Sequence, residues 1–396
     1  MTMQVKEQSV PIAARDRLHF LDIVRGFAML GIIMVNYFII ATSSSLMTDS
    51  SESFTQLLVQ WFAEGKFYTL FSFLFGIGFI IFMNRAETRF DAPRIIFMRR
   101  LVVLFGFGLL HITLIWSGDI LTYYAVTGLL LLAFYKCRPR TLLIWSAILM
   151  VLSSLLPLSW ILQPQSVSGT ELFADNGANS SYLASIGARF AEAGSFISTA
   201  PTMIIPMLMM FLLGMYFVKQ GLFHQMETKK KLWYRIWIVC ACCFLFVETS
   251  TIISTLNGSG MAMQSFGITT MINQLGGVIG SLFYMSSLAM LFLHVSRLRP
   301  LLMLMGNVGR MSLTCYLLHS TIGTWLFFDY GLGLGKLVQP VGVAAIGFGV
   351  FLFLITFSSL WLKRFKYGPV EWIWRKLTYG KMTNAKNERT TRSQAV

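Results

Sequence analysis

The sequence predicts an all-α protein, a polytopic transmembrane helical bundle of about ten spans with additional short interfacial helices. Two properties of the 396-residue chain support this prediction: 55% of its residues are hydrophobic and only 12% are charged. The charged share is about half of the roughly 25% found in a soluble domain. A span needs about 20 mostly apolar residues, and the chain supplies long apolar segments instead of short alternating strands. This excludes a soluble enzyme, a secreted disulfide scaffold, a disordered chain and an outer-membrane barrel.

Residues 21–43 form the first long apolar segment, after a polar and basic start. The segment is longer than the 7–15-residue apolar region of a signal peptide, and no small-residue cleavage motif follows it. We therefore expect it to remain in the mature protein as the first span. Nine further apolar segments complete the predicted bundle. They cover residues 67–84, 101–117, 120–135, 141–162, 201–218, 236–256, 267–294, 301–328 and 337–362.

The distribution of charge predicts the orientation. The chain has 32 Lys and Arg against 17 Asp and Glu, a formal net charge of +15. If the spans alternate across the membrane, all basic residues except Lys66, Arg189 and Lys336 fall in every second loop or in the termini. The positive-inside rule then predicts a single integral membrane domain with both termini cytoplasmic, an extracytoplasmic loop at 163–200 and a basic cytoplasmic tail at 363–396. This accounts for the positive charge, and no nucleic-acid partner is expected.

Three amphipathic stretches are predicted to lie on the membrane surface instead of crossing it, because apolar residues recur in them at helical spacing beside polar ones. The first two would cover the outer face, and the third would hold the tail against anionic lipid. They are residues 54–62, 183–197 and 370–377.

Ionisable side chains inside the apolar segments are candidates for function, since each costs about 2.5–3.5 kcal/mol on the insertion scale and must pair, line a hydrated path or do chemistry. Asp22 and Arg25 open the first span and share a helix face at a spacing of three. There are two interpretations of these residues. Either they form a structural ion pair, or Arg25 turns inward and binds an anion from the cytoplasm. Arg310 begins the polar part of the ninth span and either marks the interface or joins Arg25 in a basic cytoplasmic mouth.

His111 and Glu248 are the central candidates for proton chemistry. His111 lies past the middle of the third span, and Asp119 follows in a very tight outer turn. Eight residues of helix cover about 12 Å, so the two side chains pair directly only if the turn folds back. His111 is then either a buried packing residue or a base oriented by Asp119. Glu248 has no cation within a turn on its own helix, so its partner comes from another span or desolvation keeps it protonated.

Three more polar residues complete the candidate substrate-binding set. Asn36 lies in the outer half of the first span, where its amide either joins two helices by a hydrogen bond or lines a polar path. Tyr316 and His319 follow Arg310 in the ninth span at six and nine residues. The histidines and acids form no Ser–His–Asp triad, and the five cysteines have no spacing that suits a metal or a disulfide framework.

Several long motifs carry a family resemblance. They are RLHFLDIVRGFAMLGIIMVNYF (17–38), EGKFYTLFSFLFGIGF (64–79), RRLVVLFGFGLLHITLIWSGDILTYYAVTGLL (99–130), GRMSLTCYLLHS (309–320) and KYGPVEWIWRKLTYG (366–380). Together they resemble the YeiB/YxaH-like family of bacterial multi-pass membrane proteins, a domain-of-unknown-function family (418). The resemblance covers nearly the whole chain apart from the 163–200 loop. It implies a protein of the bacterial cell membrane, in a family described loosely as transport-related.

The first span also resembles the wider superfamily of membrane acyltransferases. Its bacterial sugar O-acetyltransferases have an arginine followed after ten residues by a catalytic histidine. The matching residues here are Arg25 and Asn36, and an amide cannot act as a general base. The heparan-type acetyltransferases carry asparagine there and a histidine in the next outer loop, but residues 43–64 contain no histidine. His111 could act as the general base in place of the histidine that is missing from both positions. His319 stands where relatives often carry glutamine.

Two functions from different classes follow. The first is transport of a small or lipid-linked anion, with Arg25 and Arg310 at the cytoplasmic mouth and His111 and Glu248 as protonation sites. The second is an acyltransferase that moves an acyl group from cytoplasmic acyl-CoA to an extracytoplasmic sugar or lipid, with His111 as base and Asp119 as its orienter. A scaffold whose polar groups only pack is a third reading. The bilayer and a small-molecule or lipid-linked substrate are the expected partners, and no cofactor is expected apart from acyl-CoA as donor in the second case.

Overall fold

The computed structural model describes residues 14–44, 54–155, 178–192, 195–223, 226, 228–256 and 263–380. Throughout these ranges the regular structure is helical, with no β-strand, which confirms the predicted all-α bundle for the described part of the chain. In chain order the α-helices are α1 (Ala14–Ser44), α2 (Phe54–Phe62), α3 (Lys66–Arg89), α4 (Pro93–Leu114), α5 (Leu121–Phe134), α6 (Pro139–Leu155), α8 (Tyr182–Glu192), α9 (Ser195–Lys219), α10 (Lys230–Leu256), α11 (Met263–His294), α12 (Arg299–Arg310), α13 (Ser312–Phe327), α14 (Pro340–Arg364) and α15 (Pro369–Tyr379).

The number of full-length spans is lower than predicted. Within the described ranges, seven helical segments are long and apolar enough to cross a membrane, and an eighth is present if α12 and α13 count as one broken span. The predicted count of about ten is therefore slightly too high. The difference lies in α5, which occupies a predicted span with only 14 residues, and in α6, of which the described residues cover 17, up to Leu155. Hydropathy cannot separate such a short apolar helix from a full span of about 20 residues, because both are equally apolar.

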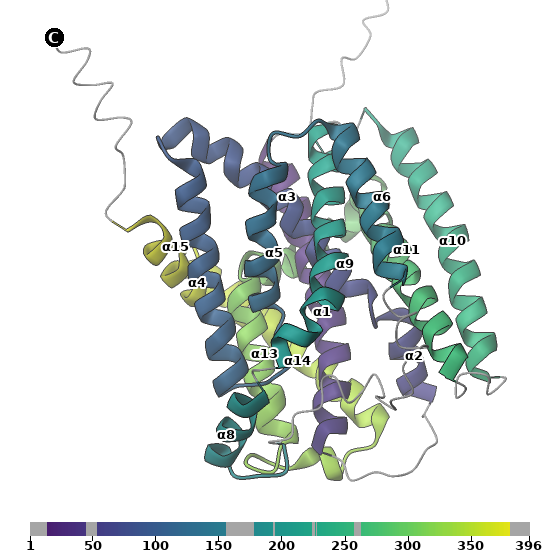
Figure 1. Cartoon of the computed structure of the whole chain (residues 1–396), viewed down its shortest axis with the longest axis vertical. Coiled ribbons are helices and arrows are strands. Elements are labelled where there is room, and N and C mark those ends of the chain that lie inside the picture. Colours follow the sequence, from purple (N-terminus) through teal and green to yellow (C-terminus); the bar gives the residue numbers. More distant parts are fainter. Residues whose placement is uncertain are drawn as a thin grey trace, which may run out of the picture.

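The long helices run side by side between the two ends of the bundle (Figure 1). α10 forms one flank and α4 the opposite flank, with α15 outside α4. The α3–α4 and α5–α6 junctions lie at the same end, where α1 and α10 also begin, and α8 lies at the other end. The basic stretches 85–100 and 136–140 therefore share one end of the molecule. That this end is cytoplasmic remains a prediction.

The described parts of the three amphipathic stretches are helical. α2 and α15 fall on the first and third stretches, whereas the second is divided between α8 and the start of α9. Much of the predicted outer loop, residues 163–177 and 193–194, and the tail from 381 to 396 lie outside the described residues.

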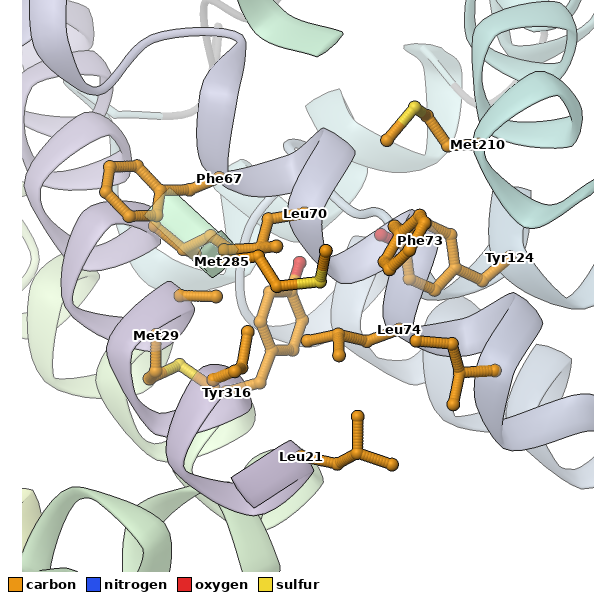
Figure 2. Close-up of a cluster of buried hydrophobic side chains, with 14 of the residues drawn as sticks. Leu21, Met29, Phe67, Leu70, Phe73, Leu74, Tyr124, Met210, Met285 and Tyr316 are labelled. Atoms are coloured by element: carbon orange, nitrogen blue, oxygen red, sulfur yellow. The ribbon is translucent and has the colours of Figure 1, made fainter. Parts of the chain in front are cut away.

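The centre of the bundle is filled by apolar and aromatic side chains from many helices (Figure 2). α3 contributes the most prominent group, because its neighbours α1, α9 and α11 all pack against it. This packing sets the relative positions of the helices that enclose the polar side chains of the candidate site. The buried residues labelled in Figure 2 are Leu21, Met29, Phe67, Leu70, Phe73, Leu74, Tyr124, Met210, Met285 and Tyr316.

The flanks of the bundle are apolar and exposed, as contact with lipid requires. On α10, Val239 is 61% and Phe246 is 75% exposed, and on α6 the exposed fraction of Val151 is 61%. In water, contiguous faces of this kind would be a liability. In a bilayer they face acyl chains of the same polarity. The described chain is thus a multi-pass membrane protein.

Two glycines allow α1 and α12 to approach closely. A Cβ atom at Gly309 would lie 1.9 Å from the backbone oxygen of Asp22, and one at Gly26 would lie 1.9 Å from the backbone oxygen of Met305. Small residues permit such backbone contact between membrane helices. The contact brings the start of α1 beside Arg310, the last residue of α12.

A sharp break separates α12 from α13. The two helices meet at 81°, and Met311 between them has a non-helical backbone conformation. The first N–H groups of α13 therefore need partners. Glu371 on α15 supplies them, because its Oε1 accepts the backbone N–H of Leu313 (2.8 Å) and of Thr314 (3.0 Å), and its Oε2 accepts the Thr314 hydroxyl. Burial raises the pKa of the Glu371 carboxyl, and the hydrogen bonds from Thr314 and Leu313 oppose that shift.

Candidate functional site

A buried histidine–aspartate pair lies where α4 turns into α5. The chain leaves the helix after Leu114 and folds back over a few residues before α5 begins. As a result, Nδ1 of His111 lies 3.1 Å from Oδ1 of Asp119, and both side chains are 0% exposed. On a straight helix, eight residues would separate the two side chains by about 12 Å. The reversal of the chain after Leu114 removes this separation. The fold thus brings together the two residues that the sequence proposed as base and orienter.

Thr122 holds the aspartate in place. Oδ2 of Asp119 accepts hydrogen bonds from the backbone N–H of Thr122 (2.7 Å) and from its hydroxyl (2.8 Å). The carboxylate thereby caps the start of α5 with one oxygen and faces His111 with the other. Sequence reasoning missed Thr122, although an aspartate three residues before a threonine at a helix start is a recognisable capping pattern. Gly108 is needed here, because its Cβ would lie 2.6 Å from a Thr122 side-chain carbon.

Helix α13 places two further side chains beside the His111–Asp119 pair. The ring of Tyr316 has its centroid 5.1 Å from that of His111 and 5.3 Å from that of His319. The Tyr316 hydroxyl donates to the backbone oxygen of Gly118 at 3.5 Å, which ties α13 to the α4–α5 turn. Tyr37 on α1, also missed by sequence reasoning, donates its hydroxyl to the backbone oxygen of His319 at 3.1 Å. We refer to His111, Asp119, Tyr316 and His319 as the histidine cluster.

The histidine cluster has the chemistry of a general base. A carboxylate beside Nδ1 favours a proton on that nitrogen, which leaves Nε2 of the neutral ring as the proton acceptor. Among the described residues, neither ring nitrogen of His111 and neither ring nitrogen of the fully buried His319 has a hydrogen-bond partner. Oδ1 of Asp119 has none either, so the 3.1 Å contact with His111 is a charge contact without hydrogen-bond geometry. Buried nitrogens without partners are rare in a folded protein. Nε2 of His111 can therefore accept a proton from any donor group that comes within hydrogen-bond distance of it.

A second polar group lies at the basic end of the bundle. Nη1 of Arg25 lies 2.8 Å from Oδ1 of Asp22, and the two side chains are 28% and 18% exposed. The charges of Arg25 and Arg310 both act on the Asp22 carboxylate, and Arg310 is exposed. The two arginines of the predicted cytoplasmic mouth thus lie around one carboxylate, at the crossing of α1 and α12.

A buried ion pair joins α3 to α10. Nζ of Lys66 lies 3.1 Å from Oε1 of Glu248, with side chains 1% and 5% exposed. Lys66 also donates to the backbone oxygen of Gln60 at 3.4 Å. Its stem crosses α11 at Gly280, where a Cβ would lie 2.7 Å from Cγ of Lys66. The partner of Glu248 therefore comes from another helix, and sequence reasoning counted Lys66 only as an outer-side charge.

The polar candidates thus form three groups instead of one. The histidine cluster and the Lys66–Glu248 pair share no residue and are held by different helices. Asn36 is partly buried on α1 and takes part in none of the contacts above. Across the described ranges, no group of three or more His, Cys, Asp or Glu residues could hold a metal ion.

Family comparisons agree with this description. Residues 17–245, which include the His111–Asp119 pair, match the family model described as heparan-alpha-glucosaminide N-acetyltransferase, catalytic. Residues 217–381 match the model described as protein of unknown function (DUF418). Fold and matches together define the class as a multi-pass membrane protein with an acyltransferase-like region. No solved structure matches the chain significantly.

Bacterial relatives match over almost the full length. The chain is 31% identical over 407 residues to the uncharacterized protein YxaH of Bacillus subtilis, covering 93% of this chain and 96% of the relative. It is 28% identical over 400 residues to the uncharacterized protein YeiB of Escherichia coli, covering 90% and 95%. The chain therefore belongs to the YxaH/YeiB family. The bacterial relatives and the multi-pass fold are consistent with a location in the cell membrane.

Proposed function

We propose that the protein is a membrane acyltransferase in which His111 is the general base and Asp119 orients it. The observation that carries the proposal is the fully buried His111–Asp119 pair, in which Nδ1 of His111 faces the carboxylate and Nε2 has no partner among the described residues. The acetyltransferase family match over residues 17–245 supports the same reaction class. The catalytic histidine then lies at the end of α4, and Asn36 on α1 is not the base.

The chemistry is acyl transfer from a thioester to an oxygen or nitrogen acceptor. The acceptor hydroxyl or amine attacks the thioester carbonyl while Nε2 of His111 removes its proton. A new ester or amide bond forms, the carbon–sulfur bond breaks, and the coenzyme A thiolate leaves and is protonated. Asp119 holds the ring in the required tautomer and stabilises the imidazolium that forms.

The basic end of the bundle has the charge needed to bind acyl-CoA, the acyl donor. Acyl-CoA carries several phosphate charges, and the planar fork of arginine binds phosphate with directed hydrogen bonds. Arg25 and Arg310 lie at the same crossing. In this proposal they hold the donor at the inner end, while the histidine cluster receives the acceptor.

The test is release of free coenzyme A by purified full-length protein supplied with acetyl-CoA and an extract of bacterial membrane lipids and sugars. His111→Gln and Asp119→Asn should each lower the rate by about 10²–10⁴-fold, the usual effect of losing a general base or its orientation. His294→Gln is the matched control, because His294 is exposed at the end of α11 and should keep the wild-type rate. Equal rates in His111→Gln and wild type would overturn the proposal.

Transport of a small or lipid-linked anion is the second candidate. The observation that favours it is the Lys66–Glu248 pair, since buried intramembrane charges often mark substrate or proton paths. In proteoliposomes, a transporter would move a labelled anion without releasing coenzyme A, and His111→Gln would keep much of that flux. Coenzyme A release that disappears in His111→Gln would instead assign the acyltransferase activity.

A further inference from the structure

Helix α15 has one face against the bundle and one face, here called the free face, that is exposed within the described part of the chain. Trp374 donates its indole N–H to the backbone oxygen of Arg100 at 2.9 Å, and the Arg100 guanidinium lies 3.7 Å from the centre of the Trp374 ring. At the other end of the helix, Tyr379 stacks on Phe90 with ring centroids 5.8 Å apart. With the Glu371 contacts to α13, these interactions fix the orientation of α15 beside the start of α4.

The free face of α15 is apolar and hollowed. Trp372 is 54%, Ile373 is 40% and Leu377 is 58% exposed. These residues, with Lys376 and Gly380, line an open hollow of about 530 Å³. Trp372 and Lys376 are one turn apart, and the Lys376 ammonium lies 5.1 Å from the centre of the Trp372 ring. The hollow therefore has apolar walls and one cationic edge.

The stretch of chain that carries the hollow, residues 340–380, is strongly basic. Glu371 is the only acidic residue between 340 and 380, and its carboxylate is occupied by the N-terminus of α13. No negative charge on α15 is therefore left to oppose an anion at the free face. The basic residues of the same stretch are Lys363, Arg364, Lys366, Arg375 and Lys376.

We propose that the free face of α15 binds an anionic phospholipid of the adjoining leaflet, with its phosphate at Lys376 and its glycerol and upper acyl chain against Trp372 and Leu377. Tryptophan prefers the level of the headgroups, and lysine extends its charge toward them. Anionic lipids attract basic segments at this level. The apolar walls favour a lipid over an acidic protein segment, which would place charged side chains against Trp372. This inference goes beyond the proposed catalytic function and does not depend on it.

Native mass spectrometry of the full-length protein in detergent tests the proposal, with dioctanoyl-phosphatidylglycerol and dioctanoyl-phosphatidylcholine as probes. The wild type should bind the anionic lipid more tightly. Lys376→Gln should weaken phosphatidylglycerol binding about fivefold, the usual effect of one basic residue at a membrane surface, and leave phosphatidylcholine unchanged. Trp372→Ser should weaken both lipids, because it removes the apolar wall.

Two control variants separate charge from structure. Lys376→Arg keeps the cation and should keep the preference. Lys230→Gln removes an exposed lysine at the start of α10, on the opposite flank of the bundle, and should bind both lipids like the wild type. Equal binding of the two lipids by the wild type, or equal behaviour of Lys376→Gln and Lys230→Gln, would overturn the proposal.

Discussion

Asp119 divides its two oxygens between helix structure and the histidine. Oδ2 is fixed by two hydrogen bonds from Thr122, which aims Oδ1 at His111. Thr122 is thus a positioning residue in the proposed mechanism. Its backbone N–H donates to Asp119 in any variant, whereas its hydroxyl can be removed separately.

Thr122→Val should therefore lower coenzyme A release about tenfold, because one hydrogen bond of about 1–1.5 kcal/mol to the carboxylate is lost. Thr122→Ser keeps the hydroxyl and should keep most of the rate. Val has nearly the same shape as Thr, so a lower rate in Thr122→Val reports the loss of the hydroxyl and its hydrogen bond. A wild-type rate in Thr122→Val would exclude the positioning role.

The Lys66–Glu248 pair allows a separate test of stability. Removing one partner leaves a buried charge without compensation, which typically costs about 3–5 kcal/mol. Lys66→Met and Glu248→Met should each lower the thermal unfolding midpoint of the purified protein. The double variant should recover most of the loss, because no charge then remains unpaired. If either single variant unfolds at the wild-type temperature, the pair does not stabilise the contact between α3 and α10.

At the scale of residues, sequence reasoning selected His111, Asp119 and Glu248 as candidates, and it made the His111–Asp119 contact conditional on a turn that folds back. It measured the separation of His111 and Asp119 along a straight helix, and only the reversal of the chain after Leu114 makes them neighbours. Lys66 and Glu248 are distant in the sequence, and no spacing rule relates them. Thr122 was within reach, because a helix cap is a local pattern.

Among the elements, α13 and α15 depend on each other. The carboxylate of Glu371 satisfies the start of α13 at the break after Arg310, and α13 carries Tyr316 and His319 into the histidine cluster. The packing of a short peripheral helix is thus connected to the candidate site through one side chain.

Glu371→Ala should lower the free energy of unfolding by about 1–2 kcal/mol, as the loss of a helix cap does. Glu371→Gln should remain close to the wild type. Its amide oxygen can accept the two N–H groups of α13, and burial already favours an uncharged side chain at this position. Thermal unfolding of the two variants in the same detergent compares them directly. A loss of similar size in both would mean that the negative charge, and not the hydrogen bonds, supports α13.

Element boundaries were only partly predictable from the sequence. A long apolar segment was found at every helix of the bundle, because hydropathy reports burial in lipid or protein alike. The 81° break at Met311 was not found, because residues 301–328 were interpreted as one continuous apolar segment. The bend depends on the packing of α12 on α1 and on the cap from α15, which are tertiary contacts.

For the whole molecule, the prediction to test is orientation. The basic stretches share one end of the bundle, and α8 lies at the other. Reporter fusions after Lys386 should be active only as cytoplasmic reporters, and fusions after Ser180 only as extracytoplasmic ones. A set of fusions through the α5–α6 junction controls for disturbed insertion. An extracytoplasmic signal at Lys386 would contradict the predicted orientation of both termini.

The shortness of α5 has a consequence for the surrounding bilayer. Its 14 residues extend about 21 Å at 1.5 Å per residue, whereas the hydrocarbon layer is about 30 Å thick. Leu129 and Leu130 are 45% and 44% exposed, so this flank meets acyl chains directly. Hydrophobic mismatch of this kind is relieved by local thinning of the membrane. A thinned patch beside the histidine cluster would shorten the distance between the two aqueous phases there, and lipid chain length would then act on the protein without any specific binding site.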